Sequence, residues 1–139
     1  LERILDLTLS YANEREQFGR PIAKFQAIQH NLAILAGEVA AAVRAGDAGI
    51  AALSTSRQRL EIASSKARVN EAAGVVAEIA HQVHGAMGFT HEHQLHHFTR
   101  RVWAWREEFG NEIYWRQELG QHIAGLGPDG VWPFIANRG

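Results

Sequence analysis

Residues 82–93 read Gln-Val-His-Gly-Ala-Met-Gly-Phe-Thr-His-Glu-His, the end of an amphipathic helix followed by a glycine-rich turn. Before this turn, apolar residues recur in strictly alternating steps of three and four, at Val69, Ala72, Val76, Ile79 and Val83. This spacing places them on one face of a helix. Gly85 and Gly88 allow a ligand to approach the backbone closely, because neither residue has a Cβ. The segment therefore predicts a long helix that ends in a ligand-contacting loop.

The rest of the chain has the same helical spacing, over residues 28–43 and again over 95–105. Proline is absent from residues 23–127, and the alternation typical of strands is absent throughout. We expect helices to about residue 14, from 25 to the mid-50s, 58–83, 93–106 and 110–124, with a loop over 15–24. The predicted fold is all-α, an up-and-down four-helix bundle with additional short helices, in one domain spanning residues 1–139.

Composition excludes several classes of protein. The formal net charge is -1, so the basic surface of a general nucleic-acid binder is missing. No apolar run reaches the roughly 18 residues of a membrane span, and no secretory signal is visible. Cysteine is absent, which excludes disulfides and thiol chemistry. We expect a cytoplasmic protein without a nucleic-acid or membrane partner. Leu1 already belongs to a helical pattern, which favours a fragment of a longer chain over a trimmed natural N-terminus.

A second segment with ligand-binding potential covers residues 15–26 and reads Arg-Glu-Gln-Phe-Gly-Arg-Pro-Ile-Ala-Lys-Phe-Gln. The guanidinium of Arg15 is a permanently charged planar fork that matches two phosphate oxygens. Phe18 offers a flat apolar face beside the flexible backbone of Gly19. Taken alone, this short pattern is equally compatible with a surface arginine in a loop beside a buried phenylalanine.

Together, residues 15–26 and 82–93 resemble the C-terminal helical domain of the acyl-CoA dehydrogenase family. The run Gly-Phe-Thr-x-Glu-His and the pair Arg100–Arg101 belong to the same resemblance. Members of this family are flavin-dependent oxidoreductases of fatty acid metabolism that desaturate acyl-CoA thioesters between the α and β carbons. The resemblance thus implies FAD as cofactor, an acyl-CoA substrate and an electron-transfer flavoprotein as partner. It also implies a homo-oligomer (dimer or tetramer) or a hetero-oligomer.

The resemblance assigns residues to the FAD of the neighbouring subunit. Diphosphate and adenosine contacts fall on Arg15, Gln17, Phe18 and Gln26, and the adenine end falls on Gln82 and Gly85. Asn111 stands where the family has a flavin-contacting hydroxyl residue. The family's second turn glycine is Ala86 here, which does not easily adopt a positive φ. Gly85 also fits an ordinary helix C-cap, and both interpretations can hold together.

The family's catalytic base is missing from its usual position. Many members have a glutamate before a glycine between the last two helices, and Phe109 stands there, before Gly110. Glu108 is the nearby candidate, but a one-residue shift turns a helical side chain by about 100°. Three explanations remain open: a base upstream of this fragment, a non-catalytic subunit whose partner supplies the base, or Glu108 acting through a rearranged turn. We expect the fragment alone to be inactive.

Histidines crowd around Glu92, and the i,i+4 pairs Glu92/His96 and His93/His97 could each chelate a metal. The zincin pattern fails because Leu95 occupies the second histidine position, and a di-iron site needs more Glu-x-x-His motifs than the one present. We therefore predict no metal site and interpret the histidines as a polar network.

A ligand-free helical oligomerisation module is the competing interpretation. It would also explain the apolar seams and a tail that contains Trp132 and Phe134, which we expect to pack on another subunit or on the bundle. The two functions differ in one geometric respect. Only a cofactor-binding domain has a reason to bring Arg15, Phe18 and Gln82 to a single groove.

Overall fold

The computed structural model describes residues 1–136 and confirms the all-α bundle. Its α-helices are α1 (Glu2–Glu14), α2 (Gln26–Ala51), α3 (Gln58–His84), α4 (Leu95–Glu107), α5 (Glu112–Leu126) and α6 (Val131–Ala136). Two short strands, β1 (Glu16–Gln17) and β2 (Arg20–Pro21), and two 3-10 turns, η1 (Ile22–Lys24) and η2 (Gly85–Phe89), complete the described elements. Residues 137–139 of the predicted domain lie outside the described part.

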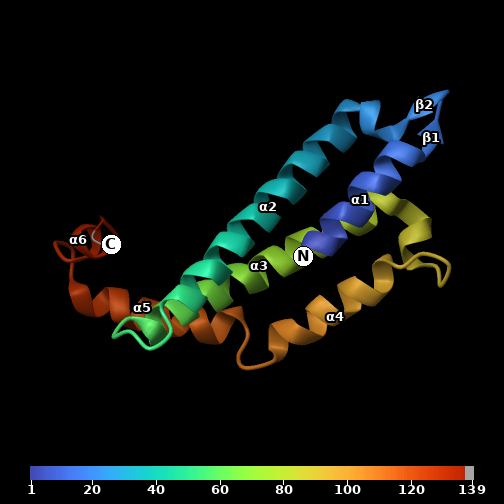
Figure 1. Ribbon diagram of the computed structural model, residues 1–139. Coiled ribbons are helices and arrows are strands. Elements are labelled where there is room, and N and C mark those ends of the chain that lie inside the picture. Colours follow the sequence, from blue (N-terminus) through green and yellow to red (C-terminus); the bar gives the residue numbers. More distant parts are fainter. Residues whose placement is uncertain (137–139) are drawn as a thin grey trace.

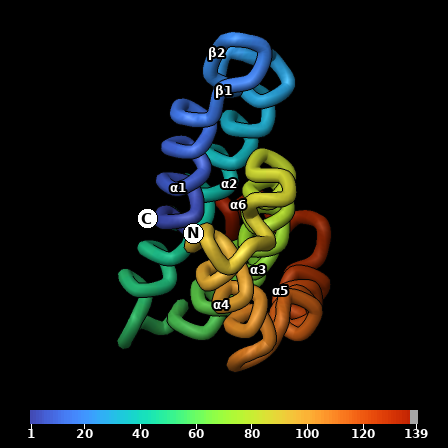
Figure 2. The backbone as a smooth tube through the Cα atoms, turned by 90° about the vertical axis from the view of Figure 1, so that its right-hand side faces the viewer, coloured from blue at the N-terminus to red at the C-terminus, as the bar shows by residue number. Residues whose placement is uncertain are grey.

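The long helix α3 organises the bundle. It packs along most of α2 and also contacts α1, α4 and α5 (Figure 1). Helices α1 and α4 cover the half of α3 that ends in the glycine turn, whereas α5 packs at its other half. Viewed from the side, the β1–β2 hairpin projects beyond the helices at one end of the molecule (Figure 2). This end also carries the start of α2.

The core lies where α1, α2, α3 and α4 meet. Val76 is 0% exposed and Ile79 is 9% exposed, which confirms the predicted buried seam of α3. The apolar cluster around them consists of Ile4, Ala12, Ile22, Leu35, Val39, Ala80, Val83 and Leu95. Full burial of a side chain of this size stabilises a fold by about 1.5–3 kcal/mol.

Helix α2 is continuous through Gly46 and Gly49, as expected. At Gly49 the two long helices approach so closely that an added Cβ would lie 3.0 Å from the Ser65 hydroxyl. A glycine inside a helix is unfavourable by about 1 kcal/mol relative to alanine, and here it makes close helix packing possible.

The predicted loop over residues 15–24 contains a β-hairpin instead of plain coil. Phe18 and Gly19 form its two-residue turn with φ angles of 53° and 76°. Positive φ at both central positions matches the right-handed twist of the flanking strands. Sequence reasoning missed the hairpin because phenylalanine rarely adopts this conformation.

The tail folds into α6, which lies apart from the main bundle next to the end of α5 (Figure 1). Phe134 packs on its own chain, since its ring centre lies 5.1 Å from that of His122 and 5.4 Å from the Arg57 guanidinium. This contact confirms the expected docking for Phe134, whereas Trp132 remains 73% exposed. No helix within residues 1–136 is long and apolar enough to cross a membrane.

Candidate functional site

A groove of about 360 Å³ opens at the hairpin end of the bundle. Its walls come from the end of α1, the hairpin, the start of α2 and the end of α3. The lining residues are Tyr11, Arg15, Gln17, Phe18, Ile22, Phe25, Ile28, Gln82, Val83, His84 and Gly85.

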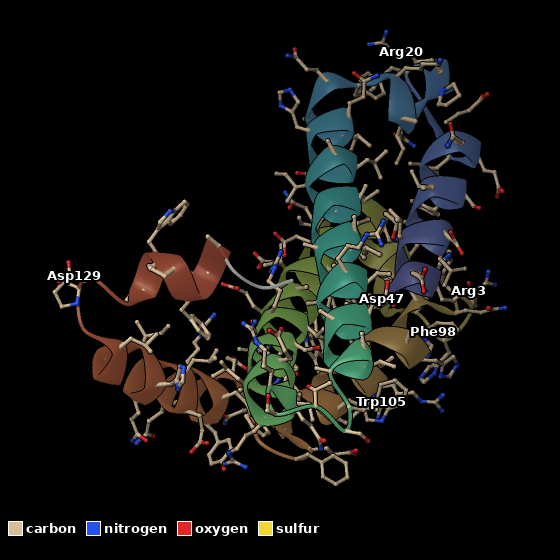
Figure 3. The ribbon with its side chains drawn as sticks, turned by 60° about the vertical axis from the view of Figure 1, so that its left-hand side comes forward. Arg3, Arg20, Asp47, Phe98, Trp105 and Asp129 are labelled. Atoms are coloured by element: carbon tan, nitrogen blue, oxygen red, sulfur yellow. The ribbon has the colours of Figure 1, made fainter. Side chains whose placement is uncertain are left out.

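Five of the seven predicted cofactor residues meet in this groove: Arg15, Gln17, Phe18, Gln82 and Gly85. Gln26 is the first residue of α2 but is exposed and does not line the groove. Asn111 is the N-cap of α5, beyond the far end of α4. Figure 3 shows this separation, with Arg20 at the hairpin end and Trp105 near the opposite end of α4.

Local backbone structure places Arg15 at the mouth of the groove. Helix α1 stops there because Arg15 is extended, with φ -74° and ψ 119°. Its N–H still donates to the Tyr11 carbonyl at 2.8 Å, and its own carbonyl accepts from the Ile22 N–H at 2.8 Å. The side chain is exposed, and no ion pair within residues 1–136 engages the guanidinium. The arrangement presents a positive charge beside the groove.

Phe18 is 93% exposed, with its ring standing edge-on to Phe25 at a centroid distance of 6.1 Å. Its left-handed backbone turns the ring outwards from the hairpin rather than into the core. An apolar face held out in this way is suited to cover the flat surface of a ligand or of another subunit.

The glycine turn closes the other side of the groove. Gly85 ends α3 with φ 58°, which confirms its C-cap role. Ala86 is not among the residues with positive φ, so the alanine in place of a second glycine fits this turn without strain. Gly88 has a packing role, because an added Cβ would lie 3.0 Å from His81 Nδ1 and from His84 Cβ.

His84 and Tyr11 also line the groove. Their rings stack at 4.4 Å with an interplanar angle of 22°, and the Tyr11 hydroxyl donates to the His84 carbonyl at 3.3 Å. His84 is 2% exposed, and its Nδ1–H donates to the Ala80 carbonyl at 2.7 Å. Burial lowers the pKa of His84 to about 4, so the ring is neutral near pH 7. Both residues were missed at the sequence level, although Tyr11 stands one helical turn before Arg15.

His81, His93 and His96 make packed and hydrogen-bonded contacts near the glycine turn. His81 Nε2 lies 2.9 Å from Thr99 Oγ1, and the His81 ring stacks on Phe89 at 4.3 Å. His96 Nδ1–H donates to the His93 carbonyl at 2.8 Å. Within the described residues, no group of three or more histidine, aspartate and glutamate side chains is arranged to hold a metal ion. The contact between His96 and His93 lies in the segment around Glu92 for which a polar network was predicted.

The turn between α4 and α5 carries Phe109, which is 90% exposed with φ 60°. Glu108 is exposed next to it. The nearby Arg106 is engaged elsewhere, in an ion pair with Glu112. Burial lowers the pKa of Lys66, and the charge of neighbouring Glu108 opposes that lowering. Glu108 therefore faces solvent and a lysine of α3.

The fold is that of an all-α helical domain, and the chain belongs to the acyl-CoA dehydrogenase family. Residues 1–123 match the family model described as "Acyl-CoA dehydrogenase, C-terminal domain". Acyl-CoA dehydrogenase IpdE2 of Mycobacterium tuberculosis is 40% identical over 102 residues, which cover 73% of this chain and 30% of that protein.

Two solved structures have a fold similar to that of this chain. The structure of glutaryl-coenzyme A dehydrogenase in complex with glutaryl-CoA superposes with a TM-score of 0.83 at 30% identity, over 89% of this chain and 32% of that one. A chain of the ChsE4-ChsE5 complex from Mycobacterium tuberculosis has a TM-score of 0.83 at 27% identity, over 88% of this chain and 34% of that one. The present chain thus spans about a third of the length of these relatives.

Proposed function

We propose that this chain is the C-terminal domain of a flavin-dependent acyl-CoA dehydrogenase that desaturates an acyl-CoA thioester between its α and β carbons. In this proposal the groove contacts the diphosphate and adenine of an FAD held by a neighbouring subunit. One observation carries it: Arg15, Phe18 and Gln82, from segments far apart in the sequence, line a single groove. A ligand-free oligomerisation module gives no reason for this convergence.

The groove residues have the chemistry that a dinucleotide requires. Arg15 supplies a charge-assisted contact to the diphosphate, a kind of hydrogen bond that contributes roughly 1.5–3 kcal/mol. Gln17 and Gln82 can each donate and accept hydrogen bonds. Phe18 offers a stacking face, and the backbone at Gly85 is open, since no atom lies within 4 Å of an added Cβ. These features fit the negatively charged and aromatic parts of FAD.

Gln26 and Asn111 have weaker support as flavin contacts. Gln26 lies outside the groove lining, on the first turn of α2. The amide of Asn111 is occupied, because its Oδ1 accepts from the Tyr114 N–H at 3.1 Å and its Nδ2 donates to Glu107 at 3.2 Å. A flavin contact at Asn111 would have to replace one of these bonds.

Arg15, Phe18 and Gln82 of the groove would hold the diphosphate and adenine of FAD, and a bound FAD would supply the hydride acceptor for this chemistry. An electron-transfer flavoprotein would then take up the electrons. The α-proton needs a separate base within hydrogen-bond reach, and Phe109 cannot serve. In our proposal the α4–α5 turn contributes apolar lining, and the base lies upstream in the full-length chain or on a partner. The full-length enzyme would act in fatty acid metabolism in the cytoplasm, as a homo-oligomer or a hetero-oligomer.

A second candidate is the non-catalytic subunit of a hetero-oligomeric acyl-CoA dehydrogenase. Two observations favour it: Phe109 at the position of the base, and the similarity to a chain of a complex named for two different components. In that case the groove would still serve a flavin, but one bound by the partner chain.

The test is Arg15→Ala in the full-length protein, with FAD occupancy measured after extended dialysis. Loss of about 1.5–3 kcal/mol of binding free energy corresponds to a roughly 10- to 150-fold larger dissociation constant for FAD. Arg3→Ala is the matched control, because it removes an exposed arginine near the start of α1, outside the groove. Equal FAD occupancy in Arg15→Ala and Arg3→Ala would refute the proposed site.

A further inference from the structure

The two sides of the groove are carried by different helices. Arg15 follows the last turn of α1, and Gln82 and Gly85 belong to the end of α3. Their relative position depends on how these two helix ends are joined. Within the groove, the side chains of Tyr11 and His84 contact each other and so connect the end of α1 to the end of α3.

Tyr11 is linked tightly to Arg15. The Arg15 N–H donates to the Tyr11 carbonyl at 2.8 Å, so a shift of Tyr11 moves the backbone that carries the guanidinium. On the other side, His84 follows Gln82 by two residues and precedes Gly85. The stacked rings and the bond from the Tyr11 hydroxyl to the His84 carbonyl therefore fix the α1 end against the glycine turn.

The His84 ring is itself locked. Its Nδ1–H is bonded to the Ala80 carbonyl, and the His93 ring packs against it at 4.6 Å with an angle of 63°. His93 is held in turn, because its Nδ1 accepts the Leu95 N–H at 3.1 Å. The His84 ring is thus held in one orientation, and the Tyr11 ring stacks on it.

We propose that Tyr11 and His84 are positioning residues for the groove, which hold Arg15 at the separation from Gln82 and Gly85 that the cofactor diphosphate and adenine require. This inference rests on the proposed function. In enzymes a misplacement of about 1 Å can cost about 10²-fold in rate, which shows how strongly such interactions depend on position. A stacked pair that fixes the spacing therefore acts on the cofactor through Arg15.

A double-mutant cycle in the full-length protein tests the proposal, with the FAD dissociation constant as readout. Tyr11→Leu should weaken FAD binding about 10-fold. Tyr11→Phe keeps the stacked ring and loses only the long 3.3 Å hydroxyl bond, so it should stay within about two-fold of the parent. In an Arg15→Ala background, Tyr11→Leu should add less than about two-fold, because the positioned group is already gone. His84→Leu removes the same stack from the other side and should reproduce the loss if Tyr11→Leu does not fold.

Phe98→Leu is the stability control, since it trims a partly buried ring of α4 outside the groove. It should lower the unfolding midpoint of the apoprotein without changing FAD affinity. Unchanged FAD binding in Arg15→Ala would refute the proposed function itself. Weakened binding in Arg15→Ala, combined with either unchanged binding in Tyr11→Leu or fully additive losses in the double mutant, would overturn the positioning role alone.

Discussion

Asn70, buried in the middle of α3, donates from Nδ2 to the Arg106 carbonyl at 3.0 Å and reaches the Gly110 carbonyl at 3.5 Å. One side chain thereby satisfies carbonyls on both sides of the turn that carries Phe109. Carbonyls at a helix end have no partner within the helix, so the amide acts as a cap from a neighbouring helix.

Replacing this amide should destabilise the fold. Asn70→Ala leaves partly buried carbonyls without this donor, and we expect a loss of about 1–3 kcal/mol in the free energy of unfolding, measured by urea denaturation. Asn13→Ala is the control, because Asn13 bonds the Leu9 carbonyl at an exposed site. We expect that control to change stability by less than about 0.5 kcal/mol. Equal effects of the two substitutions would show that the hydrogen bonds from Asn70 to the α4–α5 turn do not stabilise the fold.

The seam of α3 gives a second prediction. Val76→Ala and Ile79→Ala should each cost about 1–4 kcal/mol through lost burial and cavity formation, measured as a shift in denaturation midpoint. Ile50→Ala is the matched control, because Ile50 is 69% exposed on α2. Parent-like midpoints for both seam variants would mean that the packing face of α3 is wrongly assigned.

The third prediction concerns pH. The pKa of His84 is lowered from 6.5 to about 4, so between these values the unfolded chain binds a proton that the folded chain does not. The free energy of unfolding should therefore fall as pH decreases through this window, by up to about 1.4 kcal/mol per pH unit from this group. His84→Phe should flatten the slope between about pH 5 and 6.5. Burial also lowers the pKa of His81, so part of the slope should remain.

Urea denaturation from about pH 5 to 7.5 measures that slope while most carboxyl groups stay ionised. Above pH 7 the curves of parent and variant should run parallel, because the histidine of the unfolded chain is then mostly neutral. An identical slope in parent and His84→Phe over the acid part of the range would contradict the buried, neutral state of His84.

The fourth prediction concerns the missing base. Glu108→Gln keeps the shape of an exposed side chain and removes its charge, so we expect the rate of the full-length enzyme to stay within a few-fold. Loss of a general base usually lowers the rate by about 10²–10⁴-fold. A decrease of that size with FAD still bound would make Glu108 the base. If the rate is unaffected, assays of the full-length chain with and without a co-purified partner separate an upstream base from one on another subunit.

The helical spacing was enough to predict the bundle, the burial of Val76 and Ile79, and one long α2 through two glycines. These features depend on periodicity within single helices. The family resemblance supplied the groove residues, and the structure brings five of the seven together. What the sequence did not reveal depends on long-range packing.

The contact of Tyr11 with His84 joins positions 73 residues apart, and an aromatic residue on a helix carries no signal for such a partner. The cap by Asn70 could not be predicted from the sequence either, because the side chain of an asparagine inside a helix usually points to solvent. The hairpin was missed for a different reason. Its turn places Phe18 in a conformation that the residue type disfavours, and only the surrounding fold imposes it.

The most direct test of the central claim is a cryo-electron microscopy structure of the assembled full-length protein purified with FAD. We predict that the groove receives the FAD of a neighbouring subunit, with the diphosphate beside Arg15 and the adenine near Gln82 and Gly85. A structure in which FAD is bound elsewhere, or in which protein side chains fill the groove, would contradict the account.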